Sequence, residues 1–596
     1  MPAAVPFTPW AVFLMVAVGW FCYLSVRRAD LLAAIFLSAV LVLLIFVFPP
    51  DLANGPDTQP ARDAFWSAFD TLPKVSGMGV AELSIWLLVG IFALLAIGMP
   101  LGFASGFLAV LVLYLRFGPD VLFRTFGTGP FSVLSQRIYG LMTDYVIISV
   151  PLFIFMASLL ERSGLAKDMY TALNVWLSRT RGGIALVTAI MAIIMAAMSG
   201  IIGGEVVLLG LIALPQMLRL GYDQNLAIGT ICASGSLGTM IPPSIVLIIY
   251  GLVTETSIQQ LFTAAFIPGF ILASCYLLYI IVRTQLNPAL APLPPEQDDD
   301  MVGWSKPVRF LSFMLTLVVG AALAASFLVY MQATFGARAS GLFMPEPMLD
   351  VAVMCGVAVA ITVVMLAVLR LHRMQEAWDM GKGLVAPLVV VFVVLGSIYG
   401  GVTGITEAAG MGVVAVLLFI VLRGEFTVSL FYESVQRTFK STGTILMVTF
   451  GATTLAGAYS IAGGPAYVAN LITGADLAPF AVILVMMAIF LVLGALMDWV
   501  GIVLLVMPVF LPIILGLDLG MTPNETKIWF GILFCVNMQV SFLSPPFGPA
   551  AFYLKSVAPP HITLPDIFRG FLPFIALQLF VLALVLFFPR LTQLLL

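Results

Sequence analysis

Apolar runs long enough to cross a lipid bilayer constrain this chain more than any other feature. A transmembrane helix needs about 20 predominantly apolar residues, and runs of that length recur throughout the 596 residues. Hydrophobic residues make up 62% of the chain and charged residues only 9%, which excludes a water-soluble globule. The sequence therefore predicts an all-α polytopic membrane protein embedded in the lipid bilayer.

The few charged and metal-binding side chains exclude several other classes of protein. Because 26 basic residues face 29 acidic ones, the net charge of -3 provides no positive field for nucleic acid. Five cysteines occur singly and His372 and His561 are the only histidines, so we expect neither a disulfide framework nor a metal cluster. No nucleophile with a base and no carboxylate pair suited to catalysis is recognisable. We therefore expect neither an enzyme nor a bound cofactor.

Polar stretches and basic residues divide the sequence into four parts. We expect, in order, an N-terminal extension with two spans and a segment on the outer side of the membrane, a first repeat, a section of cytoplasmic loops with two inserted spans, and a second repeat. Their boundaries are 1–80, 81–283, 284–382 and 383–596.

Both additions to the repeats contain a pair of predicted spans. The N-terminal pair lies near 9–26 and 31–48, and the polar stretch after it is either an interfacial amphipathic helix or a simple linker. The central pair lies near 310–331 and 348–369. Basic residues flank the central pair on both sides, so both flanking loops should face the cytoplasm. An even insertion leaves the orientation of the second repeat unchanged.

Matching motifs in the same order predict that the two repeats are related. The stretches "GMPLGF", "MSGIIGGE" and "GTMIPPS" of the first half correspond to "GITEAAG", "MDWVGIVLL" and "LSPPFG" of the second. The spacing also agrees, because Pro100 to Ser199 is 99 residues and Thr406 to Asp498 is 92. Gly/Pro-interrupted apolar segments at corresponding positions are typical of a secondary transporter's binding site. The alternative is a coincidence of dipeptides that are common in membrane spans.

The stretch "SGSLGTMIPPS", residues 234–244, interrupts an apolar run with hydroxyls, glycines and two prolines. Successive prolines free backbone groups that hydrocarbon cannot satisfy, so broken helix is tolerated only beside a cavity or inside protein. Freed carbonyls suit Na⁺, as do the nearby hydroxyls of Ser234, Ser236, Thr239 and Ser244, and the N-termini of half-helices suit a carboxylate. The alternative is a proline kink whose serines bond back to their own helix.

Each Pro-Pro motif follows an apolar run with a central turn and arms too short to cross a bilayer, which predicts two re-entrant helical hairpins. Glu205 follows the first turn, and Asp498 occupies the corresponding position in the second half. An ionisable group at membrane depth is costly and usually functional. For Glu205 the alternative is a helix-end carboxylate near the interface. Thr406 and Glu407 mark a further polar break or an ordinary helix start.

Several of these stretches together resemble one family of transporters. The sequences "SVPLFIFMASLLERSGLA", "MSGIIGGEV", "GITEAAG", "LGALMDWVGIVLLVMPVFLPI" and "NMQVSFLSPPFGPAAFYL" are similar to the large (M, DctM-like) membrane subunit of TRAP transporters, the tripartite ATP-independent periplasmic systems. The resemblance covers about residues 83–283 and 383–596. It implies an elevator-type fold of the ion-transporter superfamily, with two inverted repeats, re-entrant helical hairpins and broken helices. The additional spans make this an enlarged variant.

The resemblance also implies a function and partners. It implies import of an organic acid anion, such as a 2-oxo acid or another monocarboxylate, with Na⁺ as the coupling ion. The expected partners are a small Q (DctQ-like) membrane subunit and a periplasmic substrate-binding protein, the P subunit, and the expected location is the bacterial inner membrane. The alternative is a stand-alone Na⁺- or H⁺-coupled carboxylate transporter without a binding protein.

The binding residues implied by the resemblance, together with the polar breaks, lie at the hairpin tips and at the interrupted helices. Na⁺ is expected at Ser199, Ser236, Gly238 and Ser544. The chain has "SGIIGGE", "GITE" and "SPP" where the family often has additional hydroxyls or a proline, which puts individual ligands in question while backbone carbonyls can still coordinate. The full set expected to bind Na⁺ or substrate is Ser199, Gly200, Ser236, Gly238, Thr239, Pro242, Pro243, Thr406, Asp498, Ser544, Pro545 and Gly548.

Overall fold

The computed structural model describes most of both predicted repeats. The described residues are 78–118, 130–294, 307–320, 356 and 371–596, without 178, 201–202, 402, 475–477, 496–497 and 547. The spans predicted at 9–26 and 31–48 lie outside this part of the chain, as does nearly all of the span predicted at 348–369. Of the other inserted span, the helix Pro307–Gly320 is described.

The described residues form a polytopic helical membrane protein, which confirms the predicted class. Seven of their helical stretches are long and apolar enough to cross a membrane: Tyr145–Arg162, Ile258–Leu286, Gln375–Tyr399, Ile405–Leu422, Val428–Ile461, Pro523–Leu543 and Leu564–Phe587. Large apolar side chains are exposed on several of them, for example Phe392 at 65% and Leu422 at 72%. An apolar surface of this extent is suited to lipid rather than to water.

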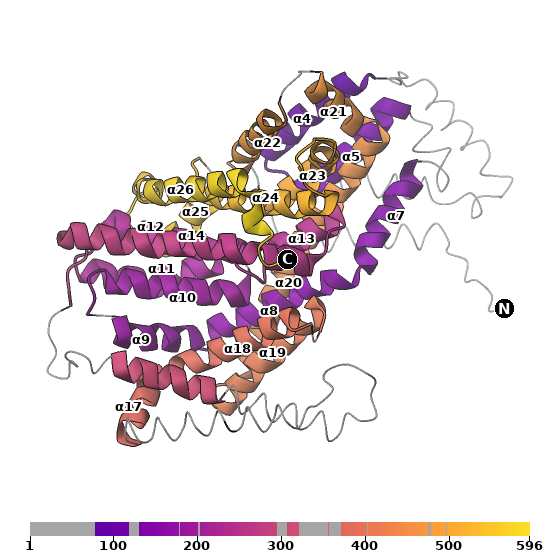
Figure 1. The fold of residues 1–596 in the computed structure, drawn as a ribbon. Coiled ribbons are helices and arrows are strands. Elements are labelled where there is room, and N and C mark those ends of the chain that lie inside the picture. The colour runs from indigo at the N-terminus through magenta and orange to yellow at the C-terminus, as the bar shows by residue number, and fades with distance from the viewer. Residues whose placement is uncertain are drawn as a thin grey trace, which may run out of the picture. The chain divides into compact units, whose positions relative to one another are not determined.

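A hairpin, a broken helix and a long closing helix make up the core of the first half. Figure 1 shows the hairpin arms running beside the broken helix and the closing helix. In chain order these elements are α10 (Gly183–Ser199), α11 (Gly204–Arg219), α12 (Gln224–Ser236), the 3-10 turn η2 (Leu237–Thr239), α13 (Ile245–Thr254) and α14 (Ile258–Leu286).

The second half repeats this order. Its hairpin, broken helix and closing helix are α22 (Pro479–Gly494), α23 (Trp499–Leu515), α24 (Pro523–Leu543), α25 (Pro549–Lys555) and α26 (Leu564–Phe587). The four hairpin arms have 16 or 17 residues each, which is less than the about 20 residues that cross a bilayer. The predicted pair of re-entrant hairpins and broken helices is therefore confirmed.

The two halves interlock through equivalent contacts. The second hairpin arm of each half packs against the half-helix that follows the Pro-Pro break of the other half, so α11 contacts α25 and α23 contacts α13. The broken helices pack in the same crossed way, α12 against α26 and α24 against α14. Each hairpin is thus supported by the other repeat as well as by its own, which brings the two breaks into one structural core.

The remaining helices precede these cores. The first half begins with α4 (Val80–Ala96), α5 (Leu101–Phe117), α7 (Pro130–Thr143), η1 (Tyr145–Ile148), α8 (Ser149–Arg162) and α9 (Leu165–Leu177). The second half begins with α17 (Leu371–Gly381), η5 (Lys382–Leu384), α18 (Val385–Tyr399), α19 (Ile405–Leu422), α20 (Val428–Ile461) and α21 (Gly464–Thr473). Helix α8 packs against both α19 and α20, so this group also combines both halves.

The apolar stretch from about 83 to 115 forms two helices. These helices, α4 and α5, are separated by Gly98 and Pro100. Gly98 has a φ of 91°, a conformation that glycine adopts without steric cost. Pro100 lies immediately before α5, where its missing N–H does not interrupt a helical hydrogen bond.

Side-chain caps explain where the broken helix and the closing helix of each half begin. Asp223 accepts a hydrogen bond from Leu226 N at the start of α12, and Ser257 caps α14. Thr522 and Thr563 form capping boxes at the starts of α24 and α26. Each such cap contributes about 1 kcal/mol to helix stability. The four caps lie at equivalent positions in the two halves. By setting where each helix begins, they also set which way its later polar residues face.

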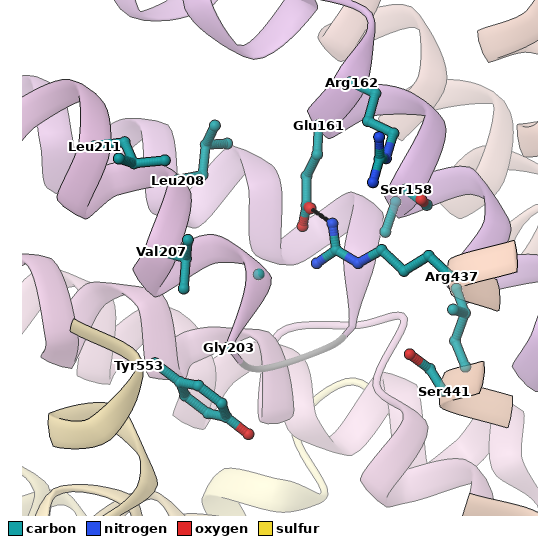
Figure 2. Close-up of a pocket in the computed structure, with 13 residues that line it drawn as sticks. Ser158, Glu161, Arg162, Gly203, Val207, Leu208, Leu211, Arg437, Ser441 and Tyr553 are labelled. Atoms are coloured by element: carbon teal, nitrogen blue, oxygen red, sulfur yellow. Dashed lines mark hydrogen bonds and ion pairs between the residues drawn. The ribbon is translucent and has the colours of Figure 1, made fainter. Parts of the chain in front are cut away.

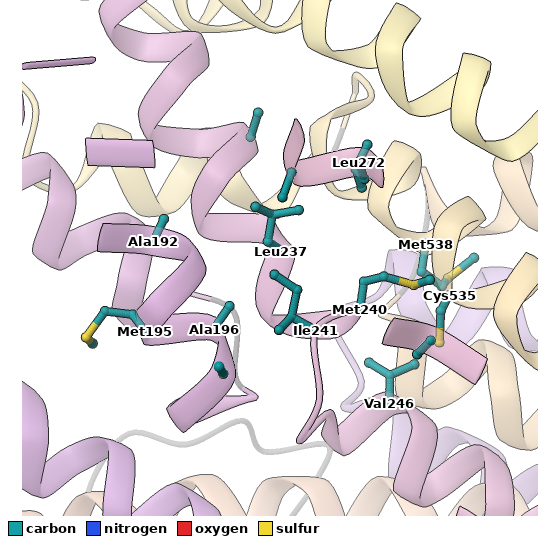
Figure 3. Close-up of a cluster of buried hydrophobic side chains, with 14 of the residues drawn as sticks. Ala192, Met195, Ala196, Leu237, Met240, Ile241, Val246, Leu272, Cys535 and Met538 are labelled. Atoms are coloured by element: carbon teal, nitrogen blue, oxygen red, sulfur yellow. The ribbon is translucent and has the colours of Figure 1, made fainter. Parts of the chain in front are cut away.

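Apolar side chains from both halves surround the first break. Figure 3 shows small and flexible side chains of α10, the break, α13, α14 and α24 packed together. Helix α12 is buried on every side from Leu226 to Ser236, so its hydroxyl-bearing face points into protein rather than toward lipid. The labelled residues of this cluster are Ala192, Met195, Ala196, Leu237, Met240, Ile241, Val246, Leu272, Cys535 and Met538.

Candidate functional site

The tip of the first hairpin is closed by a contact between its two arms. Ser199 is the last residue of α10, and its hydroxyl donates a hydrogen bond to Oε1 of Glu205 in the first turn of α11. Both residues are buried, and Glu205 is only 1% exposed. Glu205 is therefore a buried carboxylate at a helix end. Its carboxylate lies at a helix N-terminus, where the helix dipole favours negative charge.

Gly200 lets this tip approach the first Pro-Pro break closely. It ends α10 in the left-handed conformation, with a φ of 59°. A Cβ at this position would lie 2.3 Å from the carbonyl oxygen of Pro243, which no side chain can tolerate. The tip and the first break, predicted from separate motifs, are therefore in direct backbone contact.

Replacing Gly200 by alanine is expected to destabilise the protein and impair transport. The left-handed conformation costs a non-glycine residue about 1 kcal/mol, and displacement of the Pro243 carbonyl adds to this cost. Gly164→Ala is a matched control, because Gly164 has a φ of 74° with nothing within 4 Å of the added Cβ. Melting temperatures in detergent should fall more for Gly200→Ala than for Gly164→Ala. Equal melting temperatures would show that the tip does not need this contact.

Buried hydroxyls and one amide join the first break to the second half. Ser236 Oγ donates to Oε1 of Gln539 over 2.7 Å, and Nε2 of Gln539 donates to Thr239 Oγ1 over 2.6 Å. Gln539 lies on α24 and is completely buried. The amide of Gln539 thus bonds to two hydroxyls, one before and one after Leu237 and Gly238. It joins them to α24, the helix that leads into the second break.

The second break is held more by its own helix. Ser544 Oγ donates to the carbonyl oxygen of Val540 over 2.8 Å, and Gly548 N donates to the carbonyl oxygen of Ser544 over 2.8 Å. Ser544 therefore behaves as in the proline-kink alternative. Ser236 does so in part, because its hydroxyl donates to the carbonyl oxygen of Ala233 over 2.8 Å as well as to Gln539 of the other half. The Pro242-Pro243 and Pro545-Pro546 peptide bonds are both cis.

Asp498 begins the second arm of the second hairpin. Its carboxylate accepts a hydrogen bond from Val500 N at the start of α23. The residue is exposed. The ring of Tyr553 on α25 lies beside the first hairpin, since a Cβ on Gly203 would be 3.0 Å from it. Tyr553 thus brings the half-helix after the second break against the tip of the first hairpin.

Thr406 is not joined to the other predicted residues by its described hydrogen bond. Its hydroxyl donates to the carbonyl oxygen of Tyr145 in η1 over 3.2 Å, and the Tyr145 hydroxyl donates to Glu407 over 3.1 Å. All the groups in these two hydrogen bonds lie where α19 meets η1. The interpretation of Thr406 and Glu407 as an ordinary helix start agrees with the position of Thr406 in the first turn of α19.

A cavity of about 550 Å³ lies beside the first hairpin tip, between α8, α11, α20 and α25. Figure 2 shows the guanidinium of Arg437 against the carboxylate of Glu161, with Tyr553 across the space. The lining includes Gly203 and Gly204 but none of the residues predicted to bind Na⁺ or substrate. The hydroxyl-rich break and this cavity are therefore two distinct parts of the candidate site.

Three residues of this arrangement were not predicted from the sequence. Gln539 belongs to "NMQVSFLSPP", where an amide inside an apolar run before a proline break is a usable signal. Arg437 and Glu161 lie outside the interrupted segments, in "SVQRTFK" and "SLLERSG", and read as helix-end charges. Only the packing of α8 on α20 brings these two side chains together.

Two re-entrant hairpins and two interrupted helices around buried polar groups define a membrane transport protein of the secondary-transporter type. The family model described as "Tripartite ATP-independent periplasmic transporter, DctM component" matches residues 88–591. The chain therefore belongs to this family of TRAP transporter large permeases and is not an enzyme.

Individual relatives agree with this membership. The C4-dicarboxylate TRAP transporter large permease protein DctM of Pseudomonas aeruginosa is 24% identical over 460 residues, which are 76% of this chain and 87% of that protein. The ectoine TRAP transporter large permease protein TeaC of Halomonas elongata is 25% identical over 506 residues, 83% of this chain and 95% of that protein. The names of these two relatives refer to different solutes, a C4-dicarboxylate and ectoine.

Among solved structures, the fold is similar to that of the YdaH transporter of Alcanivorax borkumensis. The TM-score is 0.50 at 16% sequence identity, and the match covers 82% of this chain and 96% of that one. This likeness supports the arrangement of helices alone.

Proposed function

We propose that this chain is the large membrane subunit of a Na⁺-coupled TRAP transporter that imports an organic acid anion across the bacterial inner membrane. The match to the DctM family over residues 88–591 supports the transporter type. The observation that carries the coupling proposal is the buried hydrogen-bonded bridge from Ser236 through Gln539 to Thr239 at an interrupted helix.

Oxygen atoms at the first break support Na⁺ as the coupling ion. Ser199, Ser236 and Thr239 are all buried, and the hydroxyl of Ser234 has no hydrogen-bond partner among the described residues. Hydroxyls and backbone carbonyls freed from a helix are the ligands that broken helices offer to Na⁺. The proposed Na⁺ ligands are Ser199, Ser236, Gly238 and Ser544, with Gly200, Thr239, Pro242, Pro243, Pro545 and Gly548 forming the surrounding backbone.

The arrangement of the helices supports an elevator mechanism. The hairpins and broken helices pack on one another across the two halves, whereas α8 packs on α19 and α20. In the proposed cycle the first group moves against the second as a body and carries the site across the membrane. The cavity beside the first hairpin tip has walls from both groups, α11 and α25 on one side and α8 and α20 on the other.

The proposed partners are a small Q (DctQ-like) membrane subunit and a periplasmic binding protein that delivers the anion. Two relatives are named as large permease proteins of TRAP transporters. The word "large" in these names supports the proposal that such a transporter also has a small permease subunit. With these partners the chain functions as one component of a tripartite importer.

Uptake into proteoliposomes that contain this chain and its Q subunit is expected to require both Na⁺ and the loaded binding protein. An inward-directed Na⁺ gradient should drive accumulation of the anion, and an equal K⁺ gradient should not. If net positive charge moves inward, a negative interior accelerates uptake, because each charge gains about 2.3 kcal/mol per 100 mV.

Two controls separate the proposal from its alternatives. Uptake at the full rate in Na⁺-free buffer would contradict Na⁺ coupling. Na⁺-driven uptake of the free anion at the same rate without the binding protein would instead identify a stand-alone carrier.

A further inference from the structure

The cavity beside the first hairpin has the size and the lining of a small-molecule site. Its volume of about 550 Å³ lies within the range of about 300 to 1,000 Å³ that is typical of ligand pockets. The polar lining residues are Ser158, Glu161, Arg162, Arg437, Ser441 and Tyr553, and the apolar ones include Ile154, Val207, Leu208 and Leu211. Such a cavity matches a ligand with one polar group and a short uncharged remainder.

Arg437 is the cation that this polar lining offers to a ligand. Its Nη1 donates to Oε2 of Glu161, while a guanidinium has five N–H donors. Figure 2 shows the side chains of Ser441 and Tyr553 directed toward the same space as the guanidinium. Guanidinium groups bind carboxylates through two parallel hydrogen bonds, and these are among the strongest polar contacts in proteins. A carboxylate in this space would have Arg437 and two hydroxyls as donors.

Glu161 limits how much negative charge the cavity accepts. Its side chain is 11% exposed and pairs with Arg437, whereas Arg162 pairs with Glu433 of α20. The Glu161 carboxylate competes with a ligand for the Arg437 guanidinium, which is 40% exposed, and it repels a second ligand carboxylate. The balance of charges therefore favours a ligand with one carboxylate over one with two.

The first hairpin also contributes to this polar lining. A Cβ on Gly204 would lie 2.1 Å from Oε1 of Glu161 and 2.9 Å from Nη2 of Arg437, so the backbone that begins α11 lies directly against the ion pair. The N-terminus of this 16-residue helix adds a positive partial charge there. A ligand bound at Arg437 would therefore lie directly against the start of the first hairpin's second arm.

We propose that this cavity binds the carboxylate of a monocarboxylate through Arg437, with Glu161 as an internal competitor that sets the affinity and disfavours dicarboxylates. The proposal deepens the proposed function and rests on it, since it specifies the substrate class and the residue that recognises the anion. It assigns a role to two residues that lie outside the interrupted helices.

Titrations of the purified full-length chain in detergent test this assignment, with the melting temperature as readout and pyruvate, hexanoate and succinate as probes. A ligand that binds only the folded state raises the melting temperature in a saturable way. At constant Na⁺ and ionic strength, pyruvate or hexanoate should stabilise the protein at lower concentration than succinate. Arg437→Gln should raise the half-saturating concentration of the monocarboxylate at least tenfold.

Glu161→Gln distinguishes recognition from a structural role. Because the variant frees the guanidinium and removes a negative charge, it should lower the half-saturating monocarboxylate concentration severalfold, a gain that a structural ion pair would not give. The double variant Glu161→Gln with Arg437→Gln leaves no unpaired buried charge and should still lose the binding. Arg423→Gln is the matched control, since Arg423 pairs with Asp168 and Glu425 away from the cavity, and it should leave the titrations unchanged.

Two results would overturn the assignment. One is the absence of stabilisation of the unmodified protein by both monocarboxylates over the whole concentration range that constant Na⁺ and ionic strength allow. The other is equal half-saturation in the unmodified protein and in the double variant. Failure of the proposed function has a different signature, because Na⁺-independent uptake by the reconstituted transporter would leave the effects of Arg437 and Glu161 on monocarboxylate binding intact.

Discussion

Replacing Gln539 with alanine is expected to weaken Na⁺ binding and to destabilise the protein. The amide accepts from Ser236 and donates to Thr239, and all three residues are buried. Both hydroxyls keep a bond to a nearby carbonyl oxygen, Ser236 to Ala233 and Thr239 to Ser236, so the cost is that of two lost hydrogen bonds, about 1 kcal/mol each. The Na⁺ concentration that half-maximally raises the melting temperature, measured against K⁺ at constant ionic strength, should rise about tenfold, which corresponds to about 1.4 kcal/mol.

Asn537→Ala is the matched control for this variant. Asn537 lies two residues away on α24, is equally buried, and donates from Nδ2 to the carbonyl oxygen of Met487 over 2.9 Å. That bond joins α24 to the first arm of its own hairpin and does not reach the first break. The control should lower the melting temperature with an unchanged Na⁺ midpoint. A similar Na⁺ midpoint in both variants would show that the bridge serves stability alone.

The order of elements in the two repeats could be predicted from the sequence because helix-breaking residues act locally. Glycine and proline motifs mark where α10 ends at Ser199 and where α12 gives way to η2 and α13. These signals depend on backbone chemistry and not on distant contacts. Their recurrence in the second half was sufficient to predict its hairpin and break.

The contacts between the halves could not be predicted in the same way. Gln539 and Thr239 are 300 positions apart, and only the crossed packing of the repeats brings them together. The pairing of Glu161 with Arg437 spans 276 positions and depends on the packing of α8 against α20. The bond from the Thr406 hydroxyl to the carbonyl oxygen of Tyr145 spans 261 positions and is another contact that the sequence does not show.

Replacing both prolines of either break by alanine is expected to weaken Na⁺ binding. Alanine restores the missing N–H and removes the ring that clashes with the carbonyl one turn back, and it has the highest helix propensity. Closing the helix engages carbonyl oxygens that would otherwise face the ion. Pro242→Ala with Pro243→Ala and Pro545→Ala with Pro546→Ala should therefore act alike if the two breaks contribute to one site.

The most direct measurement of this central claim is the Na⁺ midpoint of stabilisation in the two double-proline variants, with K⁺ as the reference ion. Each variant is first required to give a cooperative melting transition in detergent, which separates ion binding from loss of fold. A paired Na⁺ site predicts a rise of about tenfold in the midpoint for both variants, equivalent to about 1.4 kcal/mol. An unchanged Na⁺ midpoint in both well-folded variants would contradict the placement of the Na⁺ site at the two breaks.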